Sequence, residues 1–228
     1  MPKHIGIIGV TSEGAALCYR TICQEGETQQ GYAHPEVTLH NLSLADYMRA
    51  IEAEDWPAVS RLLLESATKL ASIGAQFAIC PDNTAHQGLN LVRQQSPIPW
   101  LHIAEEIAAL AKQHGYRRVG VLGTRWLMEG PVYTEALAAQ GIASEFPARE
   151  VRQRISALIM DELVFGRFAP TTRQYFQEAI QVFAYNGCQA VVLGCTEIPL
   201  LIQPEHSVLP TLDSTRTLAR AALRAANA

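Results

Sequence analysis

Apolar residues along the chain alternate between short continuous runs and longer stretches with helical spacing. Ile5–Val10 is a short apolar run that predicts a buried strand, and a helix is expected from about Glu13. In Trp56–Ile73 the apolar residues recur every three or four positions, which predicts a helix that ends at Gly74. Gln76–Cys80 follows as a second short apolar run and predicts another strand.

The same alternation continues through the rest of the chain. Further strands are expected at Val37–Leu42, Arg118–Gly123, Ala190–Gly194 and Val208–Leu209. Further helices are expected at Ile103–His114, Glu150–Leu163, Thr172–Asn186 and Ser214–Ala226. Strands that are apolar almost throughout and alternate with helices are typical of a parallel sheet covered on both faces. The pattern therefore predicts an α/β fold.

Two of the expected strands end in similar segments. Gln76–Thr84 and Gln189–Thr196 each contain a Gln, an apolar strand, a reactive side chain and a Thr. The two reactive residues, Asp82 and Cys195, are 113 positions apart, about half of the chain. Ligands of open α/β sheets bind beyond the carboxyl ends of the strands. If the two halves face each other, Asp82 and Cys195 are expected to reach one cleft from opposite sides.

Composition narrows the class of protein. A length of 228 residues suits one large core or two halves of about 100 residues each. The net charge of −4 gives no basic footprint, so no nucleic-acid partner is expected. No apolar run reaches the roughly 20 residues of a membrane span, and the N-terminal run is too short for a signal peptide. Five cysteines without regular spacing favour a reducing cytoplasm, and the absence of metal-ligand spacing predicts no structural zinc, so no metal ligand is assigned.

Cys195 is the first candidate for chemistry. It follows a strand and a glycine and precedes an expected helix start at Thr196-Glu197, where helix N-terminal amides would favour the thiolate. Such a thiolate can act as a base or a nucleophile. The alternative is that Cys195 is simply buried, as cysteines often are. That second interpretation is the one expected for Cys18, Cys23 and Cys188.

Asp82, Asn83 and Thr84 combine an ionisable group with hydrogen-bond donors that could hold a carboxylate. Taken alone, the segment is better explained as a turn and helix N-cap, which these residue types favour. Thr11 and Ser12 lie at the first strand-to-helix turn and could also donate to a carboxylate. The glycines before them do not have the spacing of a dinucleotide-binding loop.

A series of segments runs along nearly the whole chain: Gly6–Glu13, Asn83-Thr84 with His86, Ile98–Ile103, Val121–Arg125, Asp161–Leu163, Leu193–Ile198 and Leu212–Thr215. In this order, the segments resemble the aspartate/glutamate racemase superfamily. The resemblance implies two pseudo-symmetric Rossmann-like domains with parallel sheets, an active site in the cleft between them and a homodimer. It assigns residues 1–98 plus 205–228 to the N-terminal domain and 99–204 to the C-terminal domain.

The resemblance also implies an isomerase: a racemase or epimerase that acts on amino acids without pyridoxal phosphate or any other cofactor. In such enzymes two acid/base groups flank the substrate Cα, a role that falls here to Cys195 and Asp82. Asn83, Thr84 and Thr196 would hold the substrate carboxylate, and Thr124 would position the rest. The expected partner is a small amino acid or carboxylate.

The sequence departs from the family at Asp82, where most members have Cys and some similar ones have Thr. A carboxylate, with an ordinary pKa of about 3.9 against about 8.5 for a thiol, is much the weaker base. A protonated Asp82 could still donate a proton while Cys195 abstracts one. Two alternatives remain open: a related lyase or isomerase, similar to arylmalonate decarboxylase or maleate isomerase, and an inactive homologue that binds small acids. Phe165 stands where acidic-substrate members often carry a basic residue, which leaves Arg125 and Arg167 as candidates for a distal carboxylate.

Overall fold

The computed structural model describes the backbone of all 228 residues and the side chains of all but residues 27–30. The chain folds into two compact units. The first contains Met1–Ile103 and Thr215–Ala228, and the second contains Ala104–Ser214. These bounds differ from the domains 1–98 plus 205–228 and 99–204 that the resemblance implies, and that assignment stays a prediction.

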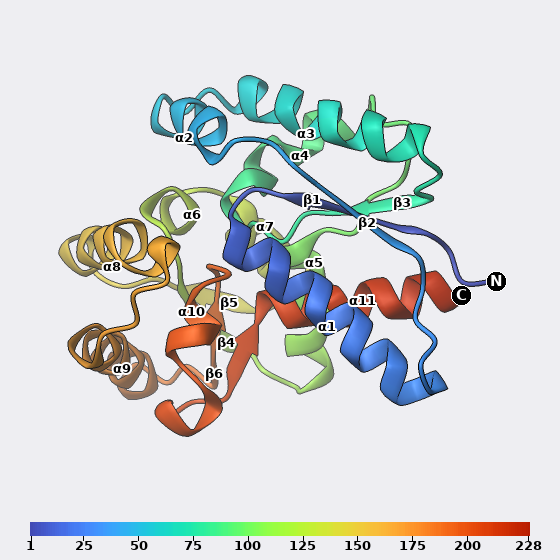
Figure 1. The fold of residues 1–228 in the computed structure, drawn as a ribbon. Coiled ribbons are helices and arrows are strands. Elements are labelled where there is room, and N and C mark those ends of the chain that lie inside the picture. Colours follow the sequence, from blue (N-terminus) through green and yellow to red (C-terminus); the bar gives the residue numbers. More distant parts are fainter. The chain divides into compact units, whose positions relative to one another are not determined.

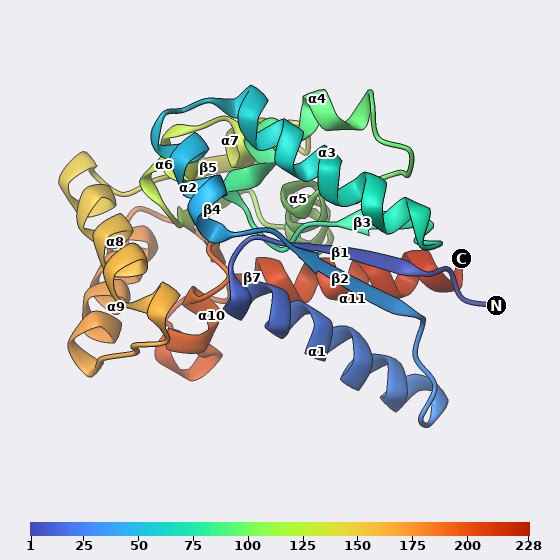
Figure 2. The same cartoon turned by 45° about the horizontal axis from the view of Figure 1, so that its top comes forward.

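The first unit is built on a parallel sheet with the strand order β2-β1-β3. The strands are β1 (Ile5–Gly9), β2 (Val37–Asn41) and β3 (Phe77–Ile79). Helix α1 (Ser12–Gln30) packs with α11 (Ser214–Asn227) against one face, where Ile5 and Ile7 share a core with Cys18 and Leu218. Helix α3 (Trp56–Ser72) covers the other face, as Figures 1 and 2 show. The remaining helices are α2 (Leu44–Glu52), the 3-10 turn η1 (Thr84–Gly88) and α4 (Leu89–Arg93).

The second unit is built on a parallel sheet with the order β5-β4-β6-β7. The strands are β4 (Arg118–Leu122), β5 (Ala143–Glu145), β6 (Ala190–Leu193) and β7 (Thr211–Asp213). One face packs against α5 (Ile103–Gln113) and α7 (Val132–Ala138), and the other against α8 (Arg149–Asp161) and α9 (Pro170–Tyr185). Shorter elements complete the unit: α6 (Arg125–Glu129), η2 (Leu163–Phe165), α10 (Ile198–Leu201) and η3 (Pro204–His206). In the part of the chain that the structure describes, no helix is long and apolar enough to cross a membrane.

The predicted α/β class with parallel sheets is confirmed, and the expected strands and helices agree with the observed ones to within a few residues, with one exception. The prediction of a strand at Val208–Leu209 was wrong. The Ser207 hydroxyl donates to the Leu209 carbonyl and accepts from the Leu209 amide, and these local bonds hold the segment in a turn. The strand starts at Thr211 instead. The helix start expected at Thr196-Glu197 is observed as the four-residue helix α10, which has its N-cap at Glu197 and begins at Ile198.

Both sheets reverse their strand order beside their first strand. The chain runs from β1 outward to β2, then returns past β1 to form β3. It repeats this route from β4 to β5 and back to β6. In open parallel sheets such a reversal leaves a crevice at the carboxyl ends of the two strands on either side of it, which are β1 and β3 in the first unit and β4 and β6 in the second. These ends carry Thr11 and Asp82 in the first unit, and Thr124 and Cys195 in the second.

The internal repeat has a structural counterpart at the amino ends of the strands in each sheet. Gln76 precedes β3, and its side-chain oxygen accepts from the His4 amide just before β1, at 3.0 Å. Gln189 precedes β6, and its side-chain oxygen accepts from the Arg117 amide just before β4, at 2.6 Å. Each Gln therefore ties together the starts of two neighbouring strands, which explains why both halves carry it at the same place.

Candidate active site

Thr11 and Ser12 lie where β1 turns into α1. Thr11 is the N-cap of the helix, and its hydroxyl oxygen accepts a hydrogen bond from the Gly14 amide at 3.3 Å. The Thr11 side chain is buried and Ser12 is exposed. The structure therefore places Thr11 in the turn between β1 and α1, as the sequence predicts.

Asp82 lies at the carboxyl end of β3 and is half buried. One carboxylate oxygen, Oδ1, accepts from the Ala85 amide at 2.8 Å and so caps the 3-10 turn η1. The turn-and-cap interpretation of this segment is therefore correct. A carboxylate has about four acceptor positions, so capping leaves room for other interactions. Asn83 and Thr84, which follow, are buried.

His86 fixes the main chain of this segment. Its Nε2 lies 3.2 Å from the Ile103 amide, which can only donate, so Nε2 accepts and the ring proton resides on Nδ1. Nδ1 then donates to the main-chain carbonyl of Asp82 at 2.7 Å. The imidazole is buried and must be neutral to make both bonds. His86 thus positions Asp82 through its backbone.

Cys80 lies two residues before Asp82 and is 1% exposed. Burial raises the pKa of its thiol well above the ordinary value, and the charge of Asp82 raises it further. Because the thiolate is the reactive form, Cys80 is inert. It does not replace the thiol that the family usually carries at the Asp82 position. Burial and the nearby Cys80 also raise the pKa of Tyr47, which α2 contributes to this neighbourhood.

Cys195 lies beyond the end of β6 and packs against the core of the second unit. The backbone before it is held close to β4, since the Gly194 amide donates to the Leu122 carbonyl at 2.7 Å. On the neighbouring strand, Thr124 is the N-cap of α6, and its hydroxyl accepts from the Leu127 amide at 3.3 Å. Thr124 and Cys195 therefore follow adjacent strands at the same edge of the sheet.

Glu197 shapes the surroundings of Cys195 and was not predicted as a site residue. The Cys195 thiol donates to Glu197 Oε2 at 2.9 Å, and the Thr196 hydroxyl donates to the same oxygen at 3.0 Å. The Glu197 side chain is fully buried. Its other oxygen, Oε1, is among the described buried polar atoms that have no hydrogen-bond partner. At the start of the short helix α10, the thiol therefore meets a buried carboxylate that accepts its hydrogen bond.

Of the other cysteines, Cys18 and Cys188 are buried as expected, whereas Cys23 is half buried. Phe165 is 69% exposed, and the Arg167 guanidinium lies over its ring at 5.6 Å. The Arg125 guanidinium lies over the Trp126 ring at 4.4 Å. Both candidates for binding a distal carboxylate, Arg125 and Arg167, thus stack on a neighbouring aromatic ring.

His102 couples the stability of the first unit to pH. Its ring meets the His86 ring edge-on at 4.6 Å. Burial lowers its pKa from 6.5 to about 4, and the charge of Arg93 adds to this shift. Because the folded-state pKa is below the unfolded value, the neutral ring favours folding above pH 6.5. That contribution, up to about 3 kcal/mol, is lost as the pH falls from 6.5 to 4.

We therefore expect His102→Gln to flatten the fall in unfolding free energy between pH 6.5 and 4, measured by urea denaturation at fixed pH. The matched control is His114→Gln, which changes an exposed histidine and should leave the slope unchanged. Equal slopes for the wild type and His102→Gln would contradict the assignment.

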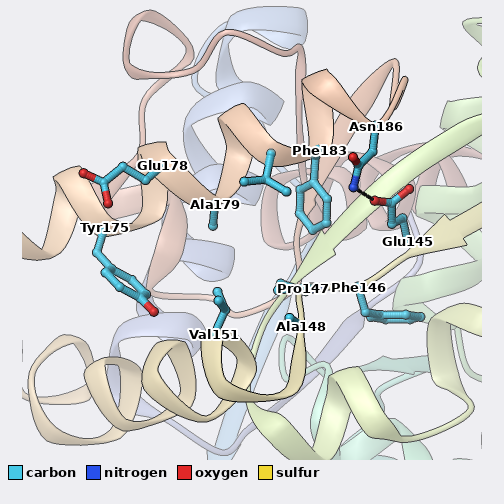
Figure 3. A pocket seen from close by; sticks show the side chains of 11 residues that line it. Glu145, Phe146, Pro147, Ala148, Val151, Tyr175, Glu178, Ala179, Phe183 and Asn186 are labelled. Atoms are coloured by element: carbon cyan, nitrogen blue, oxygen red, sulfur yellow. Dashed lines mark hydrogen bonds between the residues drawn. The ribbon is translucent and has the colours of Figure 1, made fainter.

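A pocket of about 410 Å³ opens between α8 and α9. Figure 3 shows Ala179 and Phe183 of α9 on one side and Val151 of α8 on the other, with Asn186 bonded to Glu145 at one end. Glu145 also contacts Arg118 at 3.5 Å. The pocket is mostly apolar and its lining contains none of the residues predicted for catalysis or substrate binding. It is therefore separate from the candidate site.

Comparisons with known proteins place the chain among racemases. Residues 5–222 match the family model described as Asp/Glu/Hydantoin racemase. The broad specificity amino-acid racemase RacX of Bacillus subtilis is 26% identical over 172 residues, which cover 73% of this chain and 71% of RacX. A glutamate racemase of Limosilactobacillus reuteri is 26% identical over 152 residues, which cover 66% of this chain and 53% of that racemase.

Solved structures extend the likeness to the whole chain. A Yersinia pestis protein described as a candidate Asp/Glu racemase superposes with a TM-score of 0.90 and 30% identity, over 99% of this chain and 100% of its own. An aspartate racemase homologue of Pyrococcus horikoshii gives 0.83 and 26%, over all of both chains. Racemases are isomerases, so the prediction of an isomerase agrees with these relatives. With a family model that spans residues 5–222, the chain belongs to the Asp/Glu/Hydantoin racemase family.

Proposed function

We propose that the protein is a cofactor-independent amino-acid racemase or epimerase in which Cys195 and Asp82 are the acid/base pair. The observation that carries the proposal is the position of Cys195. Its thiol stands at the carboxyl end of β6, next to the point where the strand order reverses, and it is already hydrogen-bonded to a buried carboxylate. Asp82 stands at the equivalent end of β3, 113 positions earlier.

The chemistry requires removal of a weakly acidic hydrogen from Cα. The negative charge that develops must be stabilised on the substrate carboxylate by preorganised donors. The proposed donors are Asn83 and Thr84 from the first unit and Thr196 from the second. The Thr196 hydroxyl already donates to Glu197, so we assign the hydrogen bond from Thr196 to the substrate carboxylate to the backbone amide of Thr196. Thr11, Ser12 and Thr124 are proposed to bind the remaining polar groups of the substrate.

Asp82 supplies the second proton in this proposal. A protonated Asp82 donates to one face of Cα after the Cys195 thiolate has removed the hydrogen from the other. In the reverse direction the roles exchange, as they must for a racemase that leaves the equilibrium unchanged. The proposed substrate is an amino acid, and Asp82 disfavours a second negative charge near Cα.

The direct test is hydrogen exchange at Cα. Single enantiomers of the common amino acids, among them aspartate, glutamate, alanine and phenylalanine, are incubated with the protein in D₂O. Loss of the Cα proton signal in NMR, with inversion on a chiral column, supports the proposal. Absence of exchange across the common amino acids would rule it out.

Replacing Asp82 separates its structural role from its proposed chemical one. Asp82→Asn keeps an oxygen that can accept from the Ala85 amide, so the free energy of unfolding should change by only about 0.5 kcal/mol. Racemisation should fall by about 10²-fold or more, because an amide cannot exchange a proton. Asp82→Ala serves as the structural control and should lose about 1 kcal/mol of stability with the cap. Wild-type racemisation by Asp82→Asn would exclude Asp82 as an acid/base group.

One observation favours a second function. Among the described residues, Cys195 is the one thiol available at the two proposed strand ends, since Cys80 is buried with a raised pKa. A single thiol suits a reaction that protonates one face, such as decarboxylation of an arylmalonate or isomerisation of maleate. Release of carbon dioxide from a malonate, without Cα exchange of any amino acid, would favour the lyase over the racemase.

A further inference from the structure

The Cys195 thiol and the Glu197 carboxylate form a hydrogen-bonded pair with no access to bulk water on the carboxylate side. The distance from Sγ to Oε2 is 2.9 Å, short for a bond that involves sulfur. The Glu197 side chain is 0% exposed and Cys195 is 9% exposed. The carboxylate is therefore closed to bulk water, whereas Cys195 keeps a small exposed fraction.

The Glu197 carboxylate has described hydrogen-bond partners on only one of its two oxygens. Oε2 accepts from both Cys195 and Thr196, whereas Oε1 has no hydrogen-bond partner among the described residues. A buried ionised carboxylate needs hydrogen bonds on both oxygens to offset the loss of water. The thiol already points its hydrogen at this carboxylate, so the existing hydrogen bond lies along the path that a proton would take from sulfur to Glu197.

We propose that Glu197 receives the thiol proton of Cys195 during turnover, an inference that rests on the racemase function proposed above. The S–H bond of Cys195 breaks and an O–H bond forms on Glu197 Oε2. The resulting thiolate then takes the hydrogen from the substrate Cα, and the electron pair of that C–H bond stays on the substrate. In the reverse direction the thiol protonates Cα and Glu197 returns its proton to sulfur. Glu197 is a positioning residue, because it acts through Cys195.

Three other ionisable residues of the second unit have surroundings of their own: Asp213, Tyr133 and Arg173. Asp213 ends β7, the strand next to β6. Tyr133 of α7 is fully buried, and burial raises its pKa, to which Asp213 adds. Arg173 of α9 donates to the Leu201 carbonyl at the end of α10. The described hydrogen bond that the Cys195 thiol donates goes to Glu197.

The first test compares Glu197→Gln with Glu197→Asp in racemisation. Gln keeps the length of the side chain and can accept both hydrogen bonds, but cannot take a proton. It should lower kcat by about 10²-fold or more at neutral pH, and the loss should shrink as the pH rises and solvent takes the thiol proton instead. Asp should restore part of the rate. Glu178→Gln, an exposed change on α9, is the matched control. A loss that is equal at every pH would mean a merely structural role and would overturn the proposal.

The second test needs no turnover, so it remains decisive if the protein is not a racemase. The rate at which iodoacetamide alkylates Cys195 is followed from pH 6 to 9 by mass spectrometry of the Cys195 peptide. An isolated thiol loses about tenfold in rate per pH unit below its pKa. The wild type should lose less than this, because Glu197 accepts the proton, and Glu197→Gln should lose the full tenfold. A tenfold loss per unit in the wild type itself would overturn the proposal, even if the variant fails to fold.

Discussion

Cys195→Ser is expected to abolish racemisation, lowering the rate of Cα exchange by about 10³-fold to 10⁴-fold. The Ser hydroxyl matches the thiol in position and can still donate to Glu197 Oε2. The substitution therefore keeps the local hydrogen bond and removes only the group that can ionise near neutral pH. Exchange is measured by NMR in D₂O, and stability by thermal unfolding.

The control for this variant is Cys23→Ser, which changes a half-buried cysteine of α1. It should retain wild-type exchange. If Cys195→Ser folds normally and keeps its activity, Cys195 is not the base, and the proposed site is wrong.

Gly194→Ala is expected to destabilise the second unit by about 2–3 kcal/mol. A Cβ at this position would lie 2.7 Å from the Leu122 carbonyl oxygen and 2.8 Å from Leu127 Cδ2. The carbonyl belongs to the neighbouring strand and accepts from the Gly194 amide, so it cannot retreat without breaking that bond. The strands must separate just before Cys195, and activity should fall together with stability.

Gly141→Ala provides the comparison, because a Cβ there meets nothing within 4 Å. Its left-handed φ of +72° costs an alanine about 1 kcal/mol. Urea denaturation of both variants separates the two causes. Equal destabilisation would show that close packing of β4 against β6 is not what requires a glycine at position 194.

The larger elements could be predicted from the sequence because their periodicity is local. Trp56–Ile73 has helical spacing and is followed by Gly74 with a φ of +96°, as expected. Strand β5 could not be predicted, because Ala143–Glu145 has no alternation and no β-branched residue. It is extended because it pairs with β4, a contact distant in sequence.

The residues of the candidate site also differ in whether the sequence could predict them. Asp82 and Cys195 could be found because each follows an apolar strand within a repeated pattern. Glu197 was missed because a glutamate two positions after a cysteine carries no sign of burial. Its role depends on the turn before α10, which brings its carboxylate back to the thiol. Sequence patterns located the reactive residues, and the tertiary structure decided what surrounds them.

Cys195 and Asp82 are proposed to serve opposite faces of one substrate carbon, and on this the racemase function depends. The most direct test is NMR of both enantiomers of the best substrate in D₂O with Asp82→Asn. The variant should still exchange the Cα hydrogen of the enantiomer that Cys195 attacks, without inverting it, and should leave the other enantiomer untouched. Inversion of either enantiomer at the wild-type rate would contradict this division of roles.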